Sequence, residues 1–253
     1  SAVLLSGKAF FTRQIYVMLH IIPTPVGNLE DITLRALRLL QEVDVILAED
    51  TRTSRKLLQH YDIATPLRAH HAHNENKVAD QIVRELAAGA RMALVSDAGT
   101  PGISDPGYAL IRACVQAAIP VECLPGATAV VPALVVSGLP CNRFYFEGFL
   151  PHKKGRQTRL AYISALPCTV ALYESPHRLE KCLAQLAEHC GGDRQAVVCR
   201  ELSKLYETKA RGTLADLLVQ VQDGRLKAKG EIVLVLAGKA PEKKPRKYPK
   251  PTP

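Results

Sequence analysis

The sequence predicts an α/β protein with two domains, an N-terminal domain built on a parallel sheet and a mixed α/β C-terminal domain. Short apolar segments alternate with segments of helical periodicity over residues 19–140, as in strands joined by crossover helices. Beyond residue 142, strand-like and helical segments continue in a pattern that indicates a mixed α/β domain. The change in pattern places the domain boundary near residues 140–142.

In the first half, the expected strands are short apolar runs that end in loops. They cover residues 19–22, 43–48, 91–95 and 121–124. The helices are recognised by apolar residues at helical spacing. They cover a segment from about residue 31, residues 51–60, a segment from 74 or 76 to 89, residues 105–118, and a segment ending near 136.

In the second half, the expected strands and helices alternate less regularly. The strands cover residues 143–147, 169–173, 196–200 and 231–236. The helices between them cover residues 154–166, 176–189 and 213–222.

Two terminal segments are expected to lie outside the fold. Residues 1–17 contain Lys8 and Arg13 but no acidic residue, and a convincing strand begins only after them. The other end is rich in proline, lysine and arginine, which predicts a disordered basic tail. The predicted division is an extension at 1–17, an N-terminal α/β domain at 18–140, a C-terminal α/β domain at 141–239 and a tail at 240–253.

The composition favours a polyanionic partner and a reducing compartment. Lys and Arg number 33 against 24 Asp and Glu, a formal net charge of +9. The seven cysteines form no CxxC pair, so we expect their side chains to be small buried hydrophobic groups, with neither a disulfide framework nor a zinc site. This pattern of cysteines favours a cytoplasmic protein. No apolar run reaches the roughly 18 residues of a membrane span, so no membrane association is expected.

Three loops at strand ends predict a ligand site. They cover residues 24–28, 96–104 and 125–129, and all follow strands of the first half. Ligands in open α/β sheets bind beyond the carboxyl ends of strands, and a long glycine-rich connection is more often functional than a short one. Neither GxGxxG nor GxxxxGK[ST] occurs, which argues against a dinucleotide or a phosphate loop. The alternative is an ordinary glycine-rich connection.

Charged and titratable residues gather at further strand ends. The segments are 49–53, 70–75, 146–156, 173–178 and 200–204. A charged cluster at a strand end is costly unless it is paired or used. For 49–53 the alternative is a helix cap with a surface arginine, for 70–75 a solvated turn, and for 146–156 a hinge before a solvated helix start.

Nine motifs in register resemble a known family. They read PTPVGNL, AEDTR, HNE, VSDAGTPGISDPG, LPGATA, FEGFLPHKKGR, YESPHR, RELSK and KGEIVLV over residues 19–238. In this order they are similar to the bacterial ribosomal RNA small subunit methyltransferase I family of the tetrapyrrole methylase superfamily. The resemblance implies a two-domain class III methyltransferase with S-adenosylmethionine between its domains, and it implies a homodimer. It also implies 2′-O-ribose methylation of a cytidine in the decoding region, with 16S rRNA or the small ribosomal subunit as partner.

The resemblance also implies which residues border the cofactor. In the first domain these are Pro25, Gly27, Asn28, Asp97, Ala98, Gly99, Thr100, Ile103, Ser104, Gly126, Ala127, Thr128 and Ala129. In the second domain they are Tyr173, Glu174 and Glu231. Small loops with exposed backbone groups suit such a ligand without a phosphate site.

A ribose hydroxyl is a weak nucleophile, so a positioned base is expected to assist the reaction. The candidates for this base and its orienting partners are Glu49, Asp50, His73 and Glu75. The residues expected to hold RNA are Arg52, Lys153, Lys154, Arg156 and Arg178. No metal ion is expected.

Two other functions stay open. One is a small-molecule methyltransferase of the same fold that acts on a tetrapyrrole, although the basic balance favours RNA. The other is a non-catalytic RNA-binding module, which would not need the set of three loops.

Overall fold

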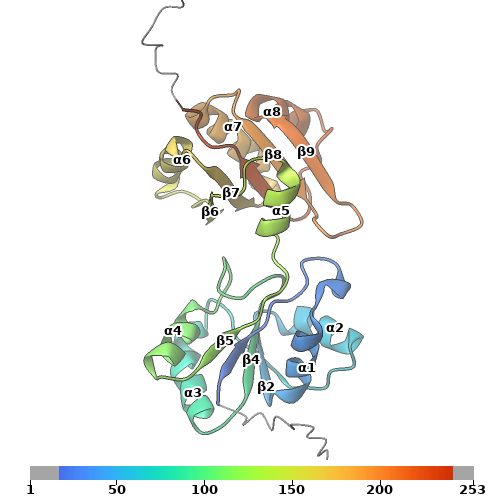
Figure 1. Cartoon of the computed structure of the whole chain (residues 1–253), viewed down its shortest axis with the longest axis vertical. Helices are drawn as coiled ribbons and strands as arrows, with labels where there is room; N and C mark the ends of the chain where they lie inside the picture. The colour runs from blue at the N-terminus through green and yellow to red at the C-terminus, as the bar shows by residue number, and fades with distance from the viewer. Residues whose placement is uncertain (1–16, 242–253) are drawn as a thin grey trace, which may run out of the picture. The chain divides into compact units, whose positions relative to one another are not determined.

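The computed structural model describes residues 17–241, which form two compact units (Figure 1). Within that range, the first unit comprises residues 17–22, 34–97 and 105–124. The second comprises residues 23–33, 98–104 and 125–241. The predicted extension at 1–17, apart from its last residue, and most of the predicted tail lie outside the described residues.

The first unit is built on a parallel five-stranded sheet, as predicted. Its order is β3-β2-β4-β1-β5, and each neighbouring pair is parallel. The strands are β1 (Leu19–Ile21), β2 (Val45–Ala48), β3 (Leu67–Ala69), β4 (Met92–Val95) and β5 (Val121–Cys123). Because β4, β1 and β5 are adjacent and parallel, their carboxyl ends lie side by side at one edge of the sheet.

Helices cover both faces of this sheet. They are α1 (Leu34–Glu42), α2 (Thr51–His60), α3 (Glu75–Ala87) and α4 (Tyr108–Gln116). Figure 1 shows α1 and α2 on one face and α3 and α4 on the other. The core under α3 and α4 joins Ile82, Leu86 and Leu110 to the apolar residues of β1 and β4. This burial holds the strand ends, and the side chains that follow them, in fixed places.

Two details of the first unit differ from the sequence-based expectations. Strand β3 was not predicted, because its edge position leaves Leu67 and Arg68 only half-buried and its three residues, interrupted by an arginine, form no apolar run. The helix expected from about residue 31 begins at Leu34, since a separate 3-10 turn over Leu29–Asp31 ends at Ile32 in an extended conformation.

The second unit combines helices with a mixed five-stranded sheet, in line with the mixed α/β domain predicted for this half, whereas the directions of its strands were not predicted. Its order is β6-β7-β10-β8-β9, with β6 and β7 parallel and the other neighbours antiparallel. The strands are β6 (Phe144–Phe149), β7 (Thr169–Glu174), β8 (Gln195–Arg200), β9 (Thr208–Thr213) and β10 (Ile232–Leu236). Edge strand β9 was not predicted, because its sequence is polar and contains a glycine.

The buried central strand β10 explains how the second unit is layered. Alternate residues face opposite sides of a strand. Ile232, Leu234 and Leu236 therefore pack under α6 (Arg156–Ala165), α7 (Leu179–Cys190) and α8 (Leu214–Gln222). Val233 and Val235 pack on the other face against α5 (Val130–Ser137).

The predicted ligand loops 24–28 and 125–129, and residues 98–104 of the loop 96–104, belong to the second unit, although the strands before them belong to the first. Residues 23–33 follow β1, residues 98–104 follow β4, and the stretch from residue 125 follows β5. The units are therefore discontinuous in sequence, whereas the domains expected from the sequence are continuous. A boundary near residue 140 stays a prediction.

Of the seven cysteines, Cys114, Cys182 and Cys199 are buried, whereas Cys123 and Cys141 are exposed, and all seven are free thiols. Burial raises the pKa of the Cys114 thiol to about 11. Within residues 17–241, no helix combines the length and the hydropathy that a bilayer crossing requires.

Candidate functional site

The three strand-end loops contact one another. Thr24 and Gly99 exchange both backbone hydrogen bonds at 2.9 Å, which forms an isolated antiparallel bridge between the loops after β1 and β4. The Thr100 hydroxyl donates to the Ala127 carbonyl at 3.4 Å, which joins the loops after β4 and β5. The structure thus brings these sequence-predicted segments together.

Glycine allows the close packing of these loops. Gly99 has φ +84°, in the left-handed region that other residues rarely adopt. A Cβ atom on Gly126 would lie 2.7 Å from Cβ of Pro23, which is closer than real Cβ atoms approach. The glycines at both positions are therefore explained by backbone conformation and by a tight loop contact.

The remaining loop residues have different surroundings. The Asn28 side chain accepts a hydrogen bond from the Glu30 amide at 3.1 Å, so its oxygen caps the following 3-10 turn. Ser104 has φ +65°, an uncommon conformation for serine, and its Oγ lies 2.9 Å from a Cβ built on Gly148 of β6. Ile103 is 47% exposed beside it.

The second-unit residues expected at the cofactor are in three different environments. Tyr173 packs edge-on against Phe146 and tilted against Phe149, so its ring belongs to an aromatic cluster. The Glu231 carboxylate pairs with Lys204 at 3.1 Å and is largely exposed. The Glu174 side chain is fully buried and is enclosed by arginines. In this arrangement Glu174 offers no accessible oxygen to a ligand, which argues against the predicted cofactor contact.

Two of the arginines predicted to hold RNA are committed to that buried carboxylate. The Arg156 guanidinium lies 3.5 Å from Glu174, and it donates to Gln185 at 2.7 Å and to the Pro151 carbonyl at 3.1 Å. Arg178 pairs with Glu174 at 2.8 Å. Arg156 is only 5% exposed, so it does not present its charge to a phosphate. We correct its predicted role to that of an internal ion-pair partner.

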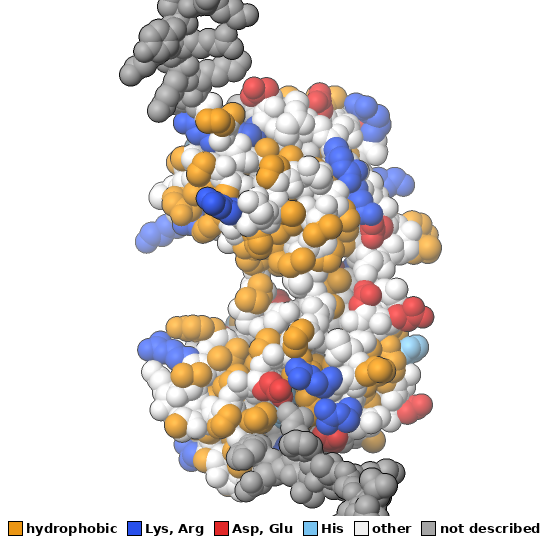
Figure 2. Space-filling view, viewed as in Figure 1, with side chains coloured by type: hydrophobic (Ala, Val, Ile, Leu, Met, Phe, Trp, Pro, Cys, Tyr) orange, Lys and Arg blue, Asp and Glu red, His pale blue; other side chains and the backbone are white. Residues whose placement is uncertain are grey.

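The other basic residues expected at RNA lie on the surface. Lys153 and Lys154 are exposed in the turn before α6. The Arg52 side chain is 87% exposed and pairs with Asp50 at 2.7 Å. Figure 2 shows Lys and Arg side chains in several separate groups over the face of the second unit that it displays. On the face that Figure 2 displays, the basic side chains therefore do not form one continuous patch.

Carboxylates gather at the carboxyl ends of β2 and β4 in the first unit. Glu49 and Asp50 follow β2, and Asp97 follows β4. The Asp50 amide donates to the Asp97 carboxylate at 3.1 Å, which ties the two strand ends together. The sequence assigned Asp97 to the cofactor, whereas the structure groups it with the predicted catalytic acids.

The pKa values of these carboxyl groups differ. Partial burial, together with the negative charges of Asp97 and Asp50, raises the pKa of Glu49 above its ordinary value. Burial also raises the pKa of Asp97, with a smaller contribution from Asp50. By contrast, hydrogen bonds from Arg52 lower the pKa of Asp50 to about 2. Glu49 is thus the stronger base of the neighbouring pair that follows β2.

The remaining catalytic candidates lie at the start of α3. The Glu75 carboxylate accepts a hydrogen bond from the Gly107 amide at 2.9 Å. His73 is exposed, and its ring lies 6.0 Å from that of His71. His71 acts electrostatically on Glu49, which connects this histidine segment to the acidic cluster. The sequence marked the triple-histidine segment but did not single out His71.

His70 is a further buried titratable group that the sequence did not single out. It is completely buried, and both of its ring nitrogens lack a hydrogen-bond partner within the described part of the chain. Burial lowers its pKa, so the ring is neutral at physiological pH. Within residues 17–241, no group of three or more His, Cys, Asp and Glu side chains is arranged to hold a metal ion.

Comparison with known proteins confirms, over most of the chain, the family resemblance that the nine sequence motifs indicated. Residues 18–218 match the family described as tetrapyrrole (corrin/porphyrin) methylases. The ribosomal RNA small subunit methyltransferase I of Xylella fastidiosa is 51% identical over 223 residues, which cover 88% of this chain and 82% of that protein. The protein of the same name from Vibrio cholerae is 48% identical over 222 residues, covering 87% and 77%.

Solved structures share the fold at low sequence identity. A cobalt precorrin-4 methyltransferase has a TM-score of 0.63 at 21% identity, covering 88% of this chain and 95% of that one. The uroporphyrin-III C-methyltransferase of Thermus thermophilus, solved with S-adenosyl homocysteine, has a TM-score of 0.60 at 18% identity, covering 87% and 97%. The chain therefore belongs to the tetrapyrrole methylase family and, within it, to the ribosomal RNA small subunit methyltransferase I proteins.

Proposed function

We propose that this protein transfers the methyl group of S-adenosylmethionine to the ribose 2′-hydroxyl of a cytidine in the decoding region of small-subunit ribosomal RNA. The observation that carries the proposal is the junction of three loops from adjacent parallel strands in a methylase-family chain. The names of its relatives support ribosomal RNA as the substrate class. We further propose that the chain works as a homodimer in the cytoplasm, where ribosomal subunits occur.

The chemistry of the loop residues fits the proposed cofactor. The loops 24–28, 96–104 and 125–129 contain no lysine or arginine, and Asp97 is their one charged residue. The loops carry neither of the two glycine-rich phosphate-binding fingerprints, whereas an adenosine with a zwitterionic amino-acid tail can be held by backbone donors and acceptors. The residues that would hold S-adenosylmethionine are Pro25, Gly27, the small residues 98–100 and 126–129, Ile103 and Ser104. The aromatic cluster of Tyr173 would lie beyond these loop residues. We retain Asn28 as a capping residue of this site and omit Glu174.

The acidic cluster supplies the proposed base. Bound S-adenosylmethionine provides a methyl group on a sulfonium leaving group. The bond from the ribose oxygen to this carbon forms as the sulfur–carbon bond breaks, and the hydroxyl proton must then be accepted. Glu49 is the preferred acceptor because its raised pKa makes it a stronger base than an ordinary carboxylate.

The other titratable candidates have supporting roles in this proposal. Asp50 stays ionised at neutral pH and holds Arg52, which is exposed and could contact RNA. Glu75 fixes the start of α4 through the Gly107 amide. His73 stays a candidate for RNA contact or proton transfer.

Methyl transfer to isolated small ribosomal subunits tests the proposed function. With a labelled methyl donor, we expect incorporation into one cytidine 2′-oxygen of the small-subunit RNA. A uroporphyrinogen offered in place of subunits should receive no label. Transfer to the tetrapyrrole alone would contradict the proposal. Binding of the subunit RNA without binding of S-adenosylhomocysteine in calorimetry would identify a non-catalytic RNA-binding module.

Replacing Lys153 and Lys154 together with alanine is expected to weaken binding to small-subunit RNA. Both lysines are exposed in the turn before α6. If each neutralises one phosphate, the slope of log affinity against log salt should fall by about 0.7 to 1 per lysine. Filter binding over a salt series measures this slope, and calorimetry should give an unchanged dissociation constant for the cofactor product.

A matched control is available on α7. Lys181 is also exposed in the second unit, and its replacement with alanine removes one lysine charge, half of what the double variant removes. The Lys181 variant should keep the wild-type slope. A double variant of Lys153 and Lys154 with the wild-type salt dependence would contradict their role in RNA binding.

A further inference from the structure

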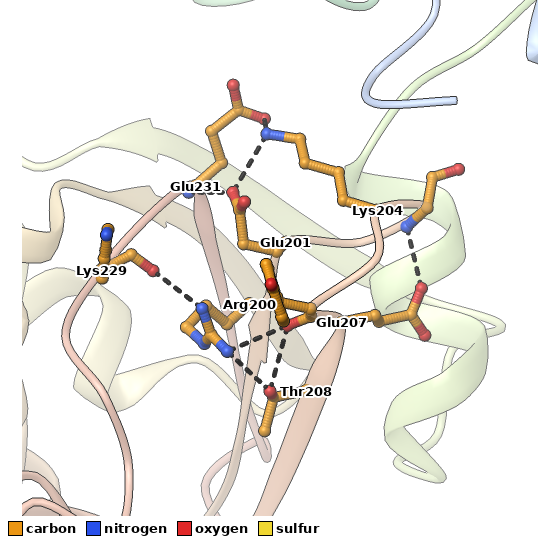
Figure 3. A network of polar contacts seen from close by, with 9 residues as sticks. Arg200, Glu201, Lys204, Glu207, Thr208, Lys229 and Glu231 are labelled. Carbon is orange, nitrogen blue, oxygen red and sulfur yellow. Dashed lines mark hydrogen bonds and ion pairs between the residues drawn. The ribbon is translucent and has the colours of Figure 1, made fainter. Parts of the chain in front are cut away.

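An ion-pair network joins the turn after β8 to the start of β10. The ammonium group of Lys204 lies 3.0 Å from Glu201 Oε1 and 3.1 Å from Glu231 Oε2 (Figure 3). The Glu201 carboxylate also accepts a hydrogen bond from the Glu231 amide at 2.8 Å. We call Glu201, Lys204 and Glu231 the Lys204 network. Both of its carboxylates pair with the lysine.

The aliphatic part of Lys204 lies directly on the loop after β1. A Cβ atom built on Gly27 would be 2.3 Å from Lys204 Cγ and 2.9 Å from its Cε. Any side chain at Gly27 would therefore displace the lysine stem. This contact places the lysine against the Pro25–Asn28 turn, which is part of the proposed cofactor site.

A second contact joins the same two segments. The Ser203 hydroxyl donates to the Asp31 carboxylate at 2.5 Å. Gly27 precedes the 3-10 turn Leu29–Asp31, and Asp31 is the last residue of that turn. The loop is therefore held at two points, one before the turn and one at its end. The turn after β8 thus fixes both the position and the direction of the loop after β1.

The backbone of this turn is strained. Glu201 has φ +53° and Ser203 has φ +69°, and neither residue is a glycine. Surrounding contacts maintain the conformation: Leu202 between them is 8% exposed in the core under α5, and the Lys204 amide donates to the Glu201 carbonyl at 3.0 Å. Such strain occurs where a local geometry is required.

The lysine remains charged in this position. Burial alone would lower the pKa of Lys204, but hydrogen bonds to Glu201 and Glu231 raise it above its ordinary value. The ammonium group is therefore available to pair with both carboxylates at neutral pH.

We propose that Lys204 is a positioning residue for the cofactor. Through its contact with Gly27 and its ion pairs with the two carboxylates, Lys204 holds the Pro25–Asn28 turn in the conformation that binds the cofactor. The inference rests on the proposed function of that turn. It also gives Glu231 a different role from the direct cofactor contact expected from the sequence.

Replacing Lys204 with methionine tests the inference, because methionine retains much of the stem over Gly27 and removes the ammonium group. If the fraction of molecules whose Pro25–Asn28 turn is in the binding conformation falls to about a tenth, the dissociation constant for S-adenosylhomocysteine rises about tenfold. The kcat at saturating S-adenosylmethionine should change less than about twofold, since the clamp acts on binding. Calorimetry and steady-state methyl transfer measure the two effects, and Lys204→Arg should restore most of the affinity.

The control variant is Lys229→Met. Lys229 is exposed two residues before Glu231, and its backbone carbonyl, not its side chain, accepts the hydrogen bond from Arg200 (Figure 3). This variant should bind S-adenosylhomocysteine as the wild type does. A Lys204→Met protein with lower thermal stability but wild-type affinity would overturn the inference and leave the network a structural role. A wild-type protein that binds no S-adenosylhomocysteine would overturn the proposed function itself.

Discussion

Replacing Glu174 with glutamine is expected to destabilise the second unit by about 3–5 kcal/mol. Glutamine keeps the size of the side chain but removes the charge that faces Arg156 at 3.5 Å and Arg178 at 2.8 Å. Two guanidinium groups would then share a buried environment without a counter-ion. Chemical unfolding followed by circular dichroism should show a lower transition midpoint.

The surroundings of this cluster make compensation difficult. One nitrogen of Arg156 and two of Arg178 are buried without a hydrogen-bond partner among the described residues. These donors already lack acceptors, and an unsatisfied buried donor carries a large desolvation cost. The glutamine amide would add donors to a site that needs an acceptor.

An exposed ion pair in the same unit provides the control for Glu174. Asp223 pairs with Arg225 at the surface, where both side chains are well exposed to solvent. Asp223→Asn should therefore leave the unfolding midpoint close to that of the wild type. A Glu174→Gln protein with the same midpoint as Asp223→Asn would show that the buried pairing contributes little.

Replacing Glu49 with glutamine is expected to lower kcat by about 10²–10⁴-fold, the usual contribution of a general base. Glutamine is similar in shape but cannot accept the proton of the ribose hydroxyl. Binding of S-adenosylhomocysteine should not change, because the proposed cofactor loops do not include Glu49. Single-turnover methyl transfer to small ribosomal subunits measures the rate, and wild-type turnover would remove Glu49 from the mechanism.

The pH dependence gives a second readout of the same group. A base works only when it is deprotonated, so the rate should fall as pH decreases through the raised pKa of Glu49. Asp97→Asn removes a negative charge that helps to raise this pKa. The acidic limb of the kcat profile should then move to lower pH. Glu42→Gln, on the exposed face of α1, should leave both the rate and the profile unchanged.

The sequence was sufficient for the layers of both units and for the three loops. Apolar runs and helical periodicity identify elements that bury their side chains, because burial leaves a regular pattern. Edge strands β3 and β9 leave no such pattern, since half-buried strands need few apolar residues. The loops were identifiable because glycines and prolines at strand ends depend on local backbone geometry.

Only the tertiary structure decided which charged residues are inside. The sequence does not distinguish which basic residues of the segment His152-Lys153-Lys154-Gly155-Arg156 are exposed and which are buried. The chain turns at Gly155, which has φ +83°, so that α6 begins at Arg156 and directs it toward Gln185 and Glu174. Lys153 and Lys154 precede the turn and remain in solvent. Whether a charged side chain is buried depends on partners far away in the chain, whereas the apolar patterns and turn residues that define strands, helices and loops are local. For this reason the sequence by itself determined the architecture, and only the tertiary structure determined which charged side chains are buried.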